Sequence, residues 1–235
     1  MTEADLARIA GYMPKLLAGA AVTIPVAVAA LALCTSLATL AALTHWSRRR
    51  AVRLLGRVYI EVARATPDLV QVYFWYYLLA EFGVKLPAVV AGILALGFGH
   101  GGSLAEAVRG GILAVDRTQW DAGHVLGMRN WQVWWRVILP QVARTILPVW
   151  TGYSVAMFKS TAFLSLVAVG ELMAAADEIG FFNFRFLEVY AIAFAIYAVI
   201  GTVTIALIRL LQRRWSTEAP RLSRRREIAV AAPAA

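Results

Sequence analysis

Cysteine and histidine are scarce in this chain. Its 235 residues include one cysteine, Cys34, which lies inside an apolar run and excludes an internal disulfide. The three histidines, His45, His100 and His124, are far apart and lack the spacing of metal ligands, so we expect no metal site. No basic region precedes a short apolar run and a small-residue cleavage site at the N-terminus, and we expect no removable signal peptide.

Charged residues are also few. They make up 16% of the chain, whereas hydrophobic residues make up 60%. A soluble domain is about 45–50% apolar, so the excess has to be buried in something other than the chain's own core. The net charge of +9 is compatible either with nucleic-acid binding or with the cytoplasmic loops of a membrane protein. The positions of the charges decide between these two classes.

Motifs for catalysis are missing. Lys159-Ser160-Thr161 is similar to the end of a phosphate-binding loop, but Tyr153 and Phe158 occupy the two positions that require glycine. No other stretch supplies such a loop, and no acid, base, nucleophile or metal constellation suggests a membrane-embedded enzyme. We therefore expect that the chain is not an enzyme and does not hydrolyse ATP by itself.

Long apolar runs account for most of the sequence. Each run approaches or exceeds the roughly 20 residues that a helix needs to cross the hydrocarbon layer. The five runs cover residues 16–43, 58–80, 86–113, 146–169 and 189–211. They predict an all-α integral membrane protein with five transmembrane helices. The expected organisation is an N-terminal segment 1–15, a membrane domain 16–214 and a flexible tail 215–235.

Arginine is concentrated in alternate connections. The loops after the first and third runs and the C-terminal tail are rich in arginine, whereas residues 81–86 and 171–188 carry acids or balanced charge. This alternation fits five spans, and the positive-inside rule places the N-terminus outside and the C-terminus in the cytoplasm. Arginines spread over three loops on one membrane face argue against nucleic acid. The basic tail is expected to contact anionic lipid headgroups.

The loop between the third and fourth runs combines helix signals with tryptophans, and Trp131, Trp134 and Trp135 lie in its second half. Asp121 is expected in the first turn of a short helix, and Gly127 is expected to end that helix in the left-handed conformation. A second amphipathic stretch follows, and Pro140 is expected to stop it. From the residues alone, this loop is either a membrane-interface element or a docking site.

The spacing in this loop resembles the coupling loop of binding-protein-dependent ABC importer permeases. That signature is Glu-Ala-Ala, three residues, Gly, nine residues, an apolar residue, one residue and Leu-Pro. Asp121 replaces its Glu and Gly123 its second Ala. The resemblance implies that a separate ATP-binding subunit docks on this loop. The matching residues are Asp121, Ala122, Gly123, Gly127, Val137, Leu139 and Pro140.

Further elements resemble the polar amino acid permeases within this superfamily, and the resemblance covers residues 15–214. They are Arg64-Ala65-Thr66-Pro67 followed by Gln71, Glu106-Ala107-Val108-Arg109-Gly110-Gly111, Lys159-Ser160-Thr161-Ala162-Phe163 and Glu171. Ser160 and Ala162 depart from the Lys-Asp-Thr-Ser-Leu pattern, and the stretch 97–102 is unusually rich in glycine. The resemblance implies that a substrate pathway is lined or supported by Arg64, Thr66, Gln71, Glu106, Lys159, Thr161 and Glu171.

The resemblance also implies a set of partners. A permease of this kind works as a pair, with itself or a related chain, in the bacterial inner membrane. Two cytoplasmic ATPase subunits bind ATP and Mg²⁺, so no cofactor is expected in this chain. An extracytoplasmic solute-binding protein delivers substrate near residues 81–86 and 171–188. The expected cargo is a polar amino acid or a related zwitterion, with ectoine-like compatible solutes or opines as alternatives, and a non-transporting scaffold subunit as the alternative of another class.

Polar residues inside the apolar runs leave structural alternatives open. Burying a charge at a helix centre costs roughly 2.5–3.5 kcal/mol, so Lys159 is expected to face the pathway or to pair with Glu171 or Glu106. Glu61, Arg64 and Asp68 share a face of the second run, and a self-satisfied cluster near its cytoplasmic end is one alternative for them. Glu106 and Arg109 lie one turn apart, and an internal pair is the alternative to a pathway role. Gly97 and Gly101 have the GxxxG spacing of a subunit interface, a kink or simple close packing.

Overall fold

The computed structural model describes residues 3–216, and every regular element within that range is helical. Residues 217–235, which include most of the expected tail, lie outside the described residues. The long helices are α1 (Glu3–Thr44), α2 (Arg50–Ala65), α5 (Ala88–Leu113), α8 (Leu139–Ser160), α9 (Leu172–Asn183) and α10 (Phe186–Ser216). The short elements are α3 (Asp68–Tyr73), η1 (Phe74–Leu78), α4 (Leu79–Glu81), α6 (Arg117–Val125), α7 (Asn130–Val133), η2 (Trp134–Ile138) and η3 (Thr161–Val167).

Three of these helices are long and apolar enough to cross a membrane. They are α1 from Arg8 to Thr44, α5, and α10 from Phe186 to Leu210. A fourth crossing is obtained if Asn130–Val167 and Leu172–Asn183, which meet at a bend of 51°, form one broken span. The apolar run 58–80 is not one helix, because α2 ends at Ala65 and α3 begins only after Pro67. Proline disfavours the helical conformation of the residue before it, and Thr66 is accordingly extended.

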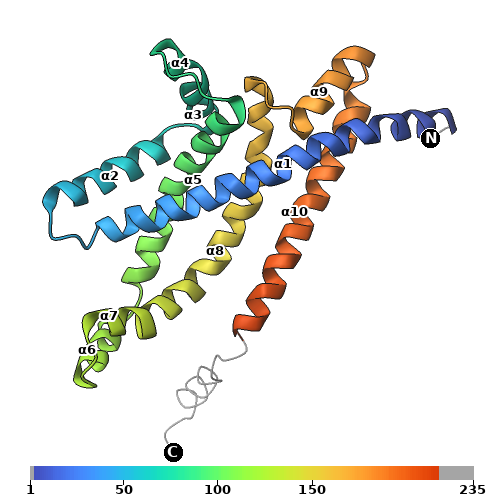
Figure 1. Ribbon diagram of the computed structural model, residues 1–235. Helices are drawn as coiled ribbons and strands as arrows, with labels where there is room; N and C mark the ends of the chain where they lie inside the picture. The colour runs from blue at the N-terminus through green and yellow to red at the C-terminus, as the bar shows by residue number, and fades with distance from the viewer. Residues whose placement is uncertain (1–2, 217–235) are drawn as a thin grey trace, which may run out of the picture.

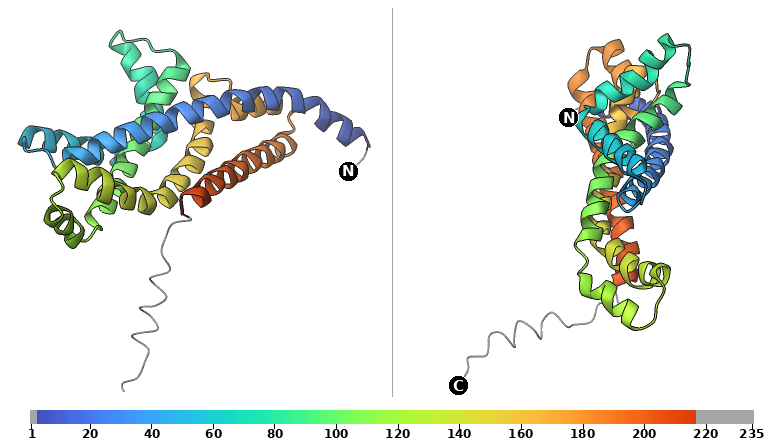
Figure 2. Two further views of the ribbon diagram at one scale, coloured as in Figure 1. Left: turned by 60° about the horizontal axis from the view of Figure 1, so that its bottom comes forward. Right: turned by 90° about the vertical axis from the view of Figure 1, so that its left-hand side faces the viewer.

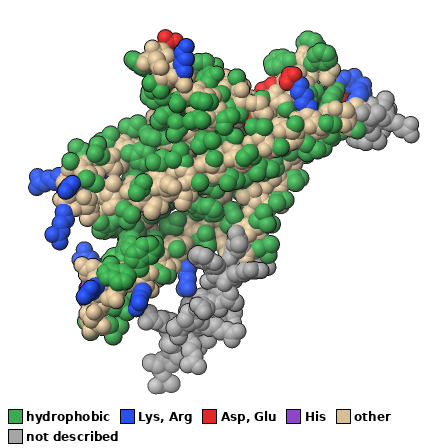
Figure 3. Space-filling view, viewed as in Figure 1, with side chains coloured by type: hydrophobic (Ala, Val, Ile, Leu, Met, Phe, Trp, Pro, Cys, Tyr) green, Lys and Arg blue, Asp and Glu red, His purple; other side chains and the backbone are tan. Residues whose placement is uncertain are grey.

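The two ends of the molecule carry different helices (Figures 1 and 2). The α6–α7 region and the end of α10 lie at one end, whereas α3, α4 and α9 lie at the other. Helix α1 crosses α5 obliquely, and this pair makes the most extensive contact between elements. Figure 3 shows Lys and Arg side chains at the α1–α2 turn and around α6 and α7, whereas near α4 and α9 Lys or Arg side chains lie beside the acids visible on this face.

The glycines of α5 let it pack closely against its neighbours. A Cβ atom at Gly97 would lie 2.7 Å from the Leu33 side chain of α1, and one at Gly102 would lie 2.5 Å from Ala63 of α2. A Cβ at Gly101 would meet the Tyr59 hydroxyl at 2.4 Å. Of the three roles that the GxxxG spacing left open, the structure therefore supports close packing within the chain.

Candidate functional site

Helix α6 begins one turn earlier than the sequence suggested. Asp116 is its N-cap, and its carboxylate accepts a hydrogen bond of 2.9 Å from the Thr118 backbone amide. That bond holds the pKa of the exposed Asp116 carboxyl below its ordinary value. Asp121 lies in the middle of α6 with its side chain exposed, so its expected place in the first turn was wrong. Its charge is free to meet a partner.

Gly127 ends α6 as the sequence predicted. It has a φ of 73°, and its amide donates to the His124 carbonyl over 2.9 Å. The Met128 amide donates to the Gly123 carbonyl over 3.1 Å, which completes a Schellman motif. Across the turn, His124 Nε2 lies 2.7 Å from Asn130 Oδ1 at the start of α7. The left-handed glycine and this contact set the angle between α6 and α7.

The second part of the loop does not stop at Pro140. Helix α7 passes through the π-helical turn η2 directly into α8, and Pro140 lies in the first turn of α8. The expectation that Pro140 stops the helix was wrong. Pro140 follows the π-helical turn η2, and such a turn locally interrupts the regular α-helical hydrogen-bond pattern, so a residue without an N–H is accommodated there.

An apolar cluster fixes the α6–η2 segment (residues 117–138) to the ends of α5 and α8. Ile112 of α5, Val133, Ile138 and Val142 of α8 are buried together. A Cβ at Gly123 would lie 2.7 Å from Val133, so a glycine at this position allows α6 to approach α7 closely. Among the predicted coupling residues, Gly123 is buried, Val137 and Leu139 are half-buried, and Asp121, Ala122, Gly127 and Pro140 are exposed.

The outer surface of the α6–η2 segment is apolar and exposed. Val125 is 87% exposed and Leu126 is 75% exposed, and the rings of Trp131 and Trp135 are also exposed. Large apolar side chains gathered on one short segment mark a surface that another molecule covers. The buried apolar cluster holds the segment against α5 and α8, and the exposed apolar side chains lie on its outer surface. This arrangement suits a docking element.

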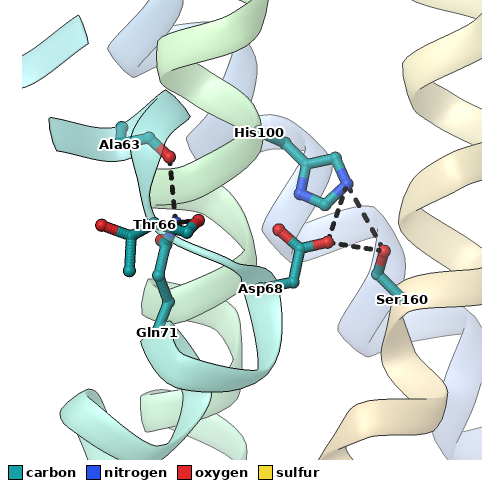
Figure 4. Close-up of polar contacts among 6 residues, drawn as sticks. All are labelled: Ala63, Thr66, Asp68, Gln71, His100 and Ser160. Carbon is teal, nitrogen blue, oxygen red and sulfur yellow. Dashed lines mark hydrogen bonds and ion pairs between the residues drawn. The ribbon is translucent and has the colours of Figure 1, made fainter. Parts of the chain in front are cut away.

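Inside the helix bundle, the Gln71 side chain supplies hydrogen-bond donors at the break between α2 and α3 (Figure 4). Its Nε2 donates to the carbonyl oxygens of Ala63, over 3.0 Å, and Thr66, over 2.9 Å. These carbonyls lose their helical donors at the break. Gln71 is buried, and the Thr66 hydroxyl is occupied by the Val62 carbonyl. Both predicted pathway residues therefore support the broken helix in this structure.

A polar cluster that the sequence reasoning missed lies beside this break. Asp68 begins α3, His100 is in the middle of α5, and Ser160 ends α8. His100 Nε2 lies 3.8 Å from Asp68 Oδ2 and 3.4 Å from Ser160 Oγ, and Ser160 Oγ lies 3.4 Å from Asp68 Oδ2 (Figure 4). Two features of the sequence could have indicated this cluster. One is a histidine, His100, within an apolar run, and the other is the departure from the family pattern at Ser160.

The other predicted pathway residues are not brought together. Arg64 is exposed on α2, and the break at Pro67 separates it and Glu61 from Asp68, so the expected three-residue cluster does not form. Glu106 pairs with Arg109 on α5, with Arg109 Nε 3.0 Å from Glu106 Oε2, as the internal-pair alternative predicted.

Lys159 and Thr161 differ sharply in exposure. Lys159 is exposed at the end of α8 and, within residues 3–216, forms no ion pair with Glu171, Glu106 or any other acid. Thr161 is buried, and its hydroxyl donates to the Phe158 carbonyl over 2.8 Å. The Lys159 ammonium group therefore needs hydrogen-bond partners from water or from outside the described chain, whereas the Thr161 hydroxyl already has one.

Glu171 is a fully buried structural junction in this structure. Its carboxylate accepts hydrogen bonds from the Tyr197 hydroxyl of α10 over 2.6 Å and from the Ala174 amide of α9 over 2.9 Å. The Thr23 hydroxyl of α1 is 3.4 Å from the same carboxylate and 3.1 Å from the Leu172 amide. Glu171 thus joins α1, α9 and α10 at the bend after η3.

Comparisons with known proteins agree with this architecture. The family model described as "Binding-protein-dependent transport system inner membrane component" matches residues 34–217. The chain is 33% identical to the probable amino-acid ABC transporter permease protein y4tG of Sinorhizobium fredii, over 88% of this chain and 90% of that protein. It is 33% identical to the octopine transport system permease protein OccM of Rhizobium meliloti, over 92% and 91%.

A solved structure is similar over the same extent. The crystal structure of an amino acid ABC transporter with histidines superposes with a TM-score of 0.82 at 34% identity, covering 91% of this chain and 100% of that one. The likeness therefore extends over most of the helical fold.

Proposed function

Because the chain belongs to the family of binding-protein-dependent transport system inner membrane components, we propose that it is the permease subunit of an ATP-driven importer for polar amino acids or related small zwitterions. The observation that carries the proposal is the exposed apolar surface of the α6–η2 segment, presented on a rigid glycine-capped turn. The similarity to an amino-acid permease and to an amino acid ABC transporter supports this cargo class.

The proposal assigns different partners to the two ends of the molecule. The end that bears α6, α7 and the arginines faces the cytoplasm, where a separate ATP-binding subunit holds ATP and Mg²⁺ and docks on the α6–η2 segment. The end that bears α4 and α9 faces outward, where a solute-binding protein delivers cargo. In this orientation, the N-terminus is outside, the C-terminus is inside, and the broken α2–α4 and α8–α9 segments each count as a crossing, which gives five.

Transport then follows from movement of paired chains. A second permease chain, the same or a related one, forms the other half of the pathway and covers polar residues such as Lys159. Closure of the ATPase subunits on ATP moves the α6–η2 segments, and the two helix bundles rock to expose the pathway alternately to each side. This chain supplies the pathway and no hydrolytic chemistry.

Two alternatives remain distinct from this proposal. The similarity to an octopine permease favours an opine as the second cargo candidate, and a competition panel of unlabelled solutes that includes octopine, ectoine and the polar amino acids separates them. A non-transporting scaffold subunit is the alternative of another class. It predicts no dependence on a bound ATPase.

The docking role is tested by affinity purification of the tagged chain from its native membranes in mild detergent. We expect a stoichiometric ATP-binding subunit with the wild type and with Gly127→Asn, since asparagine tolerates the left-handed conformation. Gly127→Val is expected to lose most of that subunit, because a β-branched residue is strained at a φ of 73°. Equal recovery with all three chains contradicts docking on this segment, and no ATPase with any of them favours the scaffold.

A further inference from the structure

The Asp68 carboxylate lacks a strong partner inside the bundle. Its contacts with Ser160 Oγ and His100 Nε2, at 3.4 and 3.8 Å, are longer than the 2.5–3.0 Å typical of charge-assisted hydrogen bonds. Among the described residues, no lysine or arginine pairs with it. Its side chain is 35% exposed, so one side of the carboxylate is open. A buried or half-buried carboxylate in a membrane bundle favours a cation beside it.

The His100 ring is nearly buried and only partly bonded. Its side chain is 10% exposed, and its Nδ1 atom is buried without a hydrogen-bond partner among residues 3–216. The glycines on both sides of it, Gly99 and Gly101, pack against Gln71 and Tyr59, which holds this part of α5 against α2 and α3. The imidazole is therefore fixed in place while part of its bonding capacity is unused.

The position of the acid differs from the pattern that the sequence resembles. That pattern has Asp where this chain has Ser160, on α8. Here the Asp68 carboxylate reaches to 3.4 Å from the Ser160 hydroxyl, but it comes from α3, across the bundle. A negative charge thus stands beside position 160 even though residue 160 is neutral.

We infer that Asp68, His100 and Ser160 form a cargo-binding site within the membrane bundle, which recognises the ammonium group of the transported zwitterion. An ammonium group has three N–H donors, and the cluster offers a carboxylate oxygen, a hydroxyl oxygen and an imidazole nitrogen as acceptors within 3.4–3.8 Å of one another. Asp68 supplies the charge, and Ser160 and His100 direct the remaining donors. This inference rests on the proposed function, because it assumes that the chain conducts a zwitterion.

The first step of the test is uptake by wild-type complex, with its ATPase and binding protein, in proteoliposomes. Labelled L-glutamine, L-arginine, L-cystine and octopine are the probes. Import of none of them, with ATP hydrolysis intact, overturns the proposed function itself. The probe with the fastest uptake is then used for equilibrium binding to the permease–ATPase complex without the binding protein, so that only the membrane site is measured.

We expect Asp68→Asn to weaken binding of that probe by at least about tenfold, since a hydrogen bond to a charged group is lost. Glu61→Gln, which removes an exposed acid of α2 outside the cluster, is the matched control and should bind like the wild type. Addition of Ser160→Asp to Asp68→Asn should restore most of the affinity, because it returns the acid to α8. The deaminated analogue of the probe should not compete.

The result that overturns the inference is clear in the same assay. Wild-type affinity in Asp68→Asn, with the wild type transporting normally, means that the cluster is an internal contact between α3, α5 and α8. Equal competition by the deaminated analogue means that the site does not recognise the ammonium group. Retention of the ATPase subunit by each variant, measured in the same preparations, shows that a loss of binding does not come from misfolding.

Discussion

A few single residues determine much of the geometry of the α6–η2 segment. The spacing of the loop predicted Gly127 at a helix end, and its φ of 73° confirms this. Asp121 and Pro140 were assigned wrong local roles, because Asp116 caps α6 and because Pro140 is accommodated after the π-helical turn η2. Short motifs fix the order of such residues, but the helix boundaries depend on caps several residues away.

Gly123 illustrates a departure from the family pattern with a packing cause. A side chain at this position would meet Val133, which belongs to the apolar cluster under the segment. We therefore expect Gly123→Ala to destabilise the segment by about 1–3 kcal/mol through overpacking. The check is recovery of the ATPase subunit and the rate of amide exchange in α6.

The matched variant for this prediction changes the other side of the contact. In a double-mutant cycle, Gly123→Ala should cost less in the Val133→Ala background than in the wild type, because the added methyl group then has space. An equal cost in both backgrounds would show that the close contact with Val133 is not the cause.

Glu171 was predicted as a pathway residue, but its surroundings give it a structural role that can be measured. Tyr197→Phe removes the donor of a 2.6 Å hydrogen bond to a fully buried carboxylate and should lower the free energy of unfolding by about 1.5–3 kcal/mol. Thermal unfolding of the purified complex is the measurement.

Tyr190→Phe is the control for the hydroxyl itself. Tyr190 is also on α10 and donates to Asp177 over 2.8 Å, but Asp177 is only half-buried, so the loss should be smaller. A double-mutant cycle of Tyr197→Phe with Glu171→Gln should give a coupling energy well above zero. Additive effects of the two changes would contradict a junction at Glu171.

At the scale of elements, hydropathy located most of the long helices, but it located neither their breaks nor α9, which forms in the predicted connection 171–188. The run 58–80 predicted one helix, whereas Pro67 ends α2 and a buried glutamine side chain replaces the lost backbone donors. Because the break was not anticipated, Asp68 was grouped with Glu61 and Arg64 and its approach to His100 was missed. For Gly97 and Gly101 of α5, close packing was one of three open alternatives, and only the structure identifies the neighbours that favour it.

The role of Gln71 leads to a prediction about the α2–α3 break. Gln71→Leu keeps the volume of the side chain but leaves the Ala63 and Thr66 carbonyls without their donor, at a cost of about 1–3 kcal/mol. We expect faster amide exchange in α3 and at the end of α2. Exchange in α10 serves as the internal reference, and equal acceleration there would indicate general loosening instead.

At the scale of the whole molecule, the arginine-rich connections predicted an orientation that surface labelling can test. Cys34→Ala removes the one native cysteine, which is buried and therefore replaceable by a small apolar residue. In that background, Val84→Cys, at an exposed position of the α4–α5 connection, should react with a membrane-impermeant maleimide in intact spheroplasts. Ser47→Cys should react only after the membrane is permeabilised.

The pattern of labelling discriminates between the possible topologies. Reaction of both cysteines from outside, or of Ser47→Cys alone, would contradict the orientation with the N-terminus outside. Composition and charge are sufficient to predict this orientation, because the bilayer acts on whole segments. They are not sufficient to identify which groups contact the exposed Lys159 side chain, since those groups belong to chains outside this one.

The central claim is that this chain conducts a zwitterion in response to an ATPase docked on the α6–η2 segment. Its most direct test is uptake of labelled polar amino acids by proteoliposomes that contain the purified permease, ATPase and binding protein, with Gly127→Val as the comparison. We predict uptake that requires ATP on the side of the α6–η2 segment and is lost with Gly127→Val. Uptake without ATP, or equal uptake by the wild type and Gly127→Val, would contradict the account.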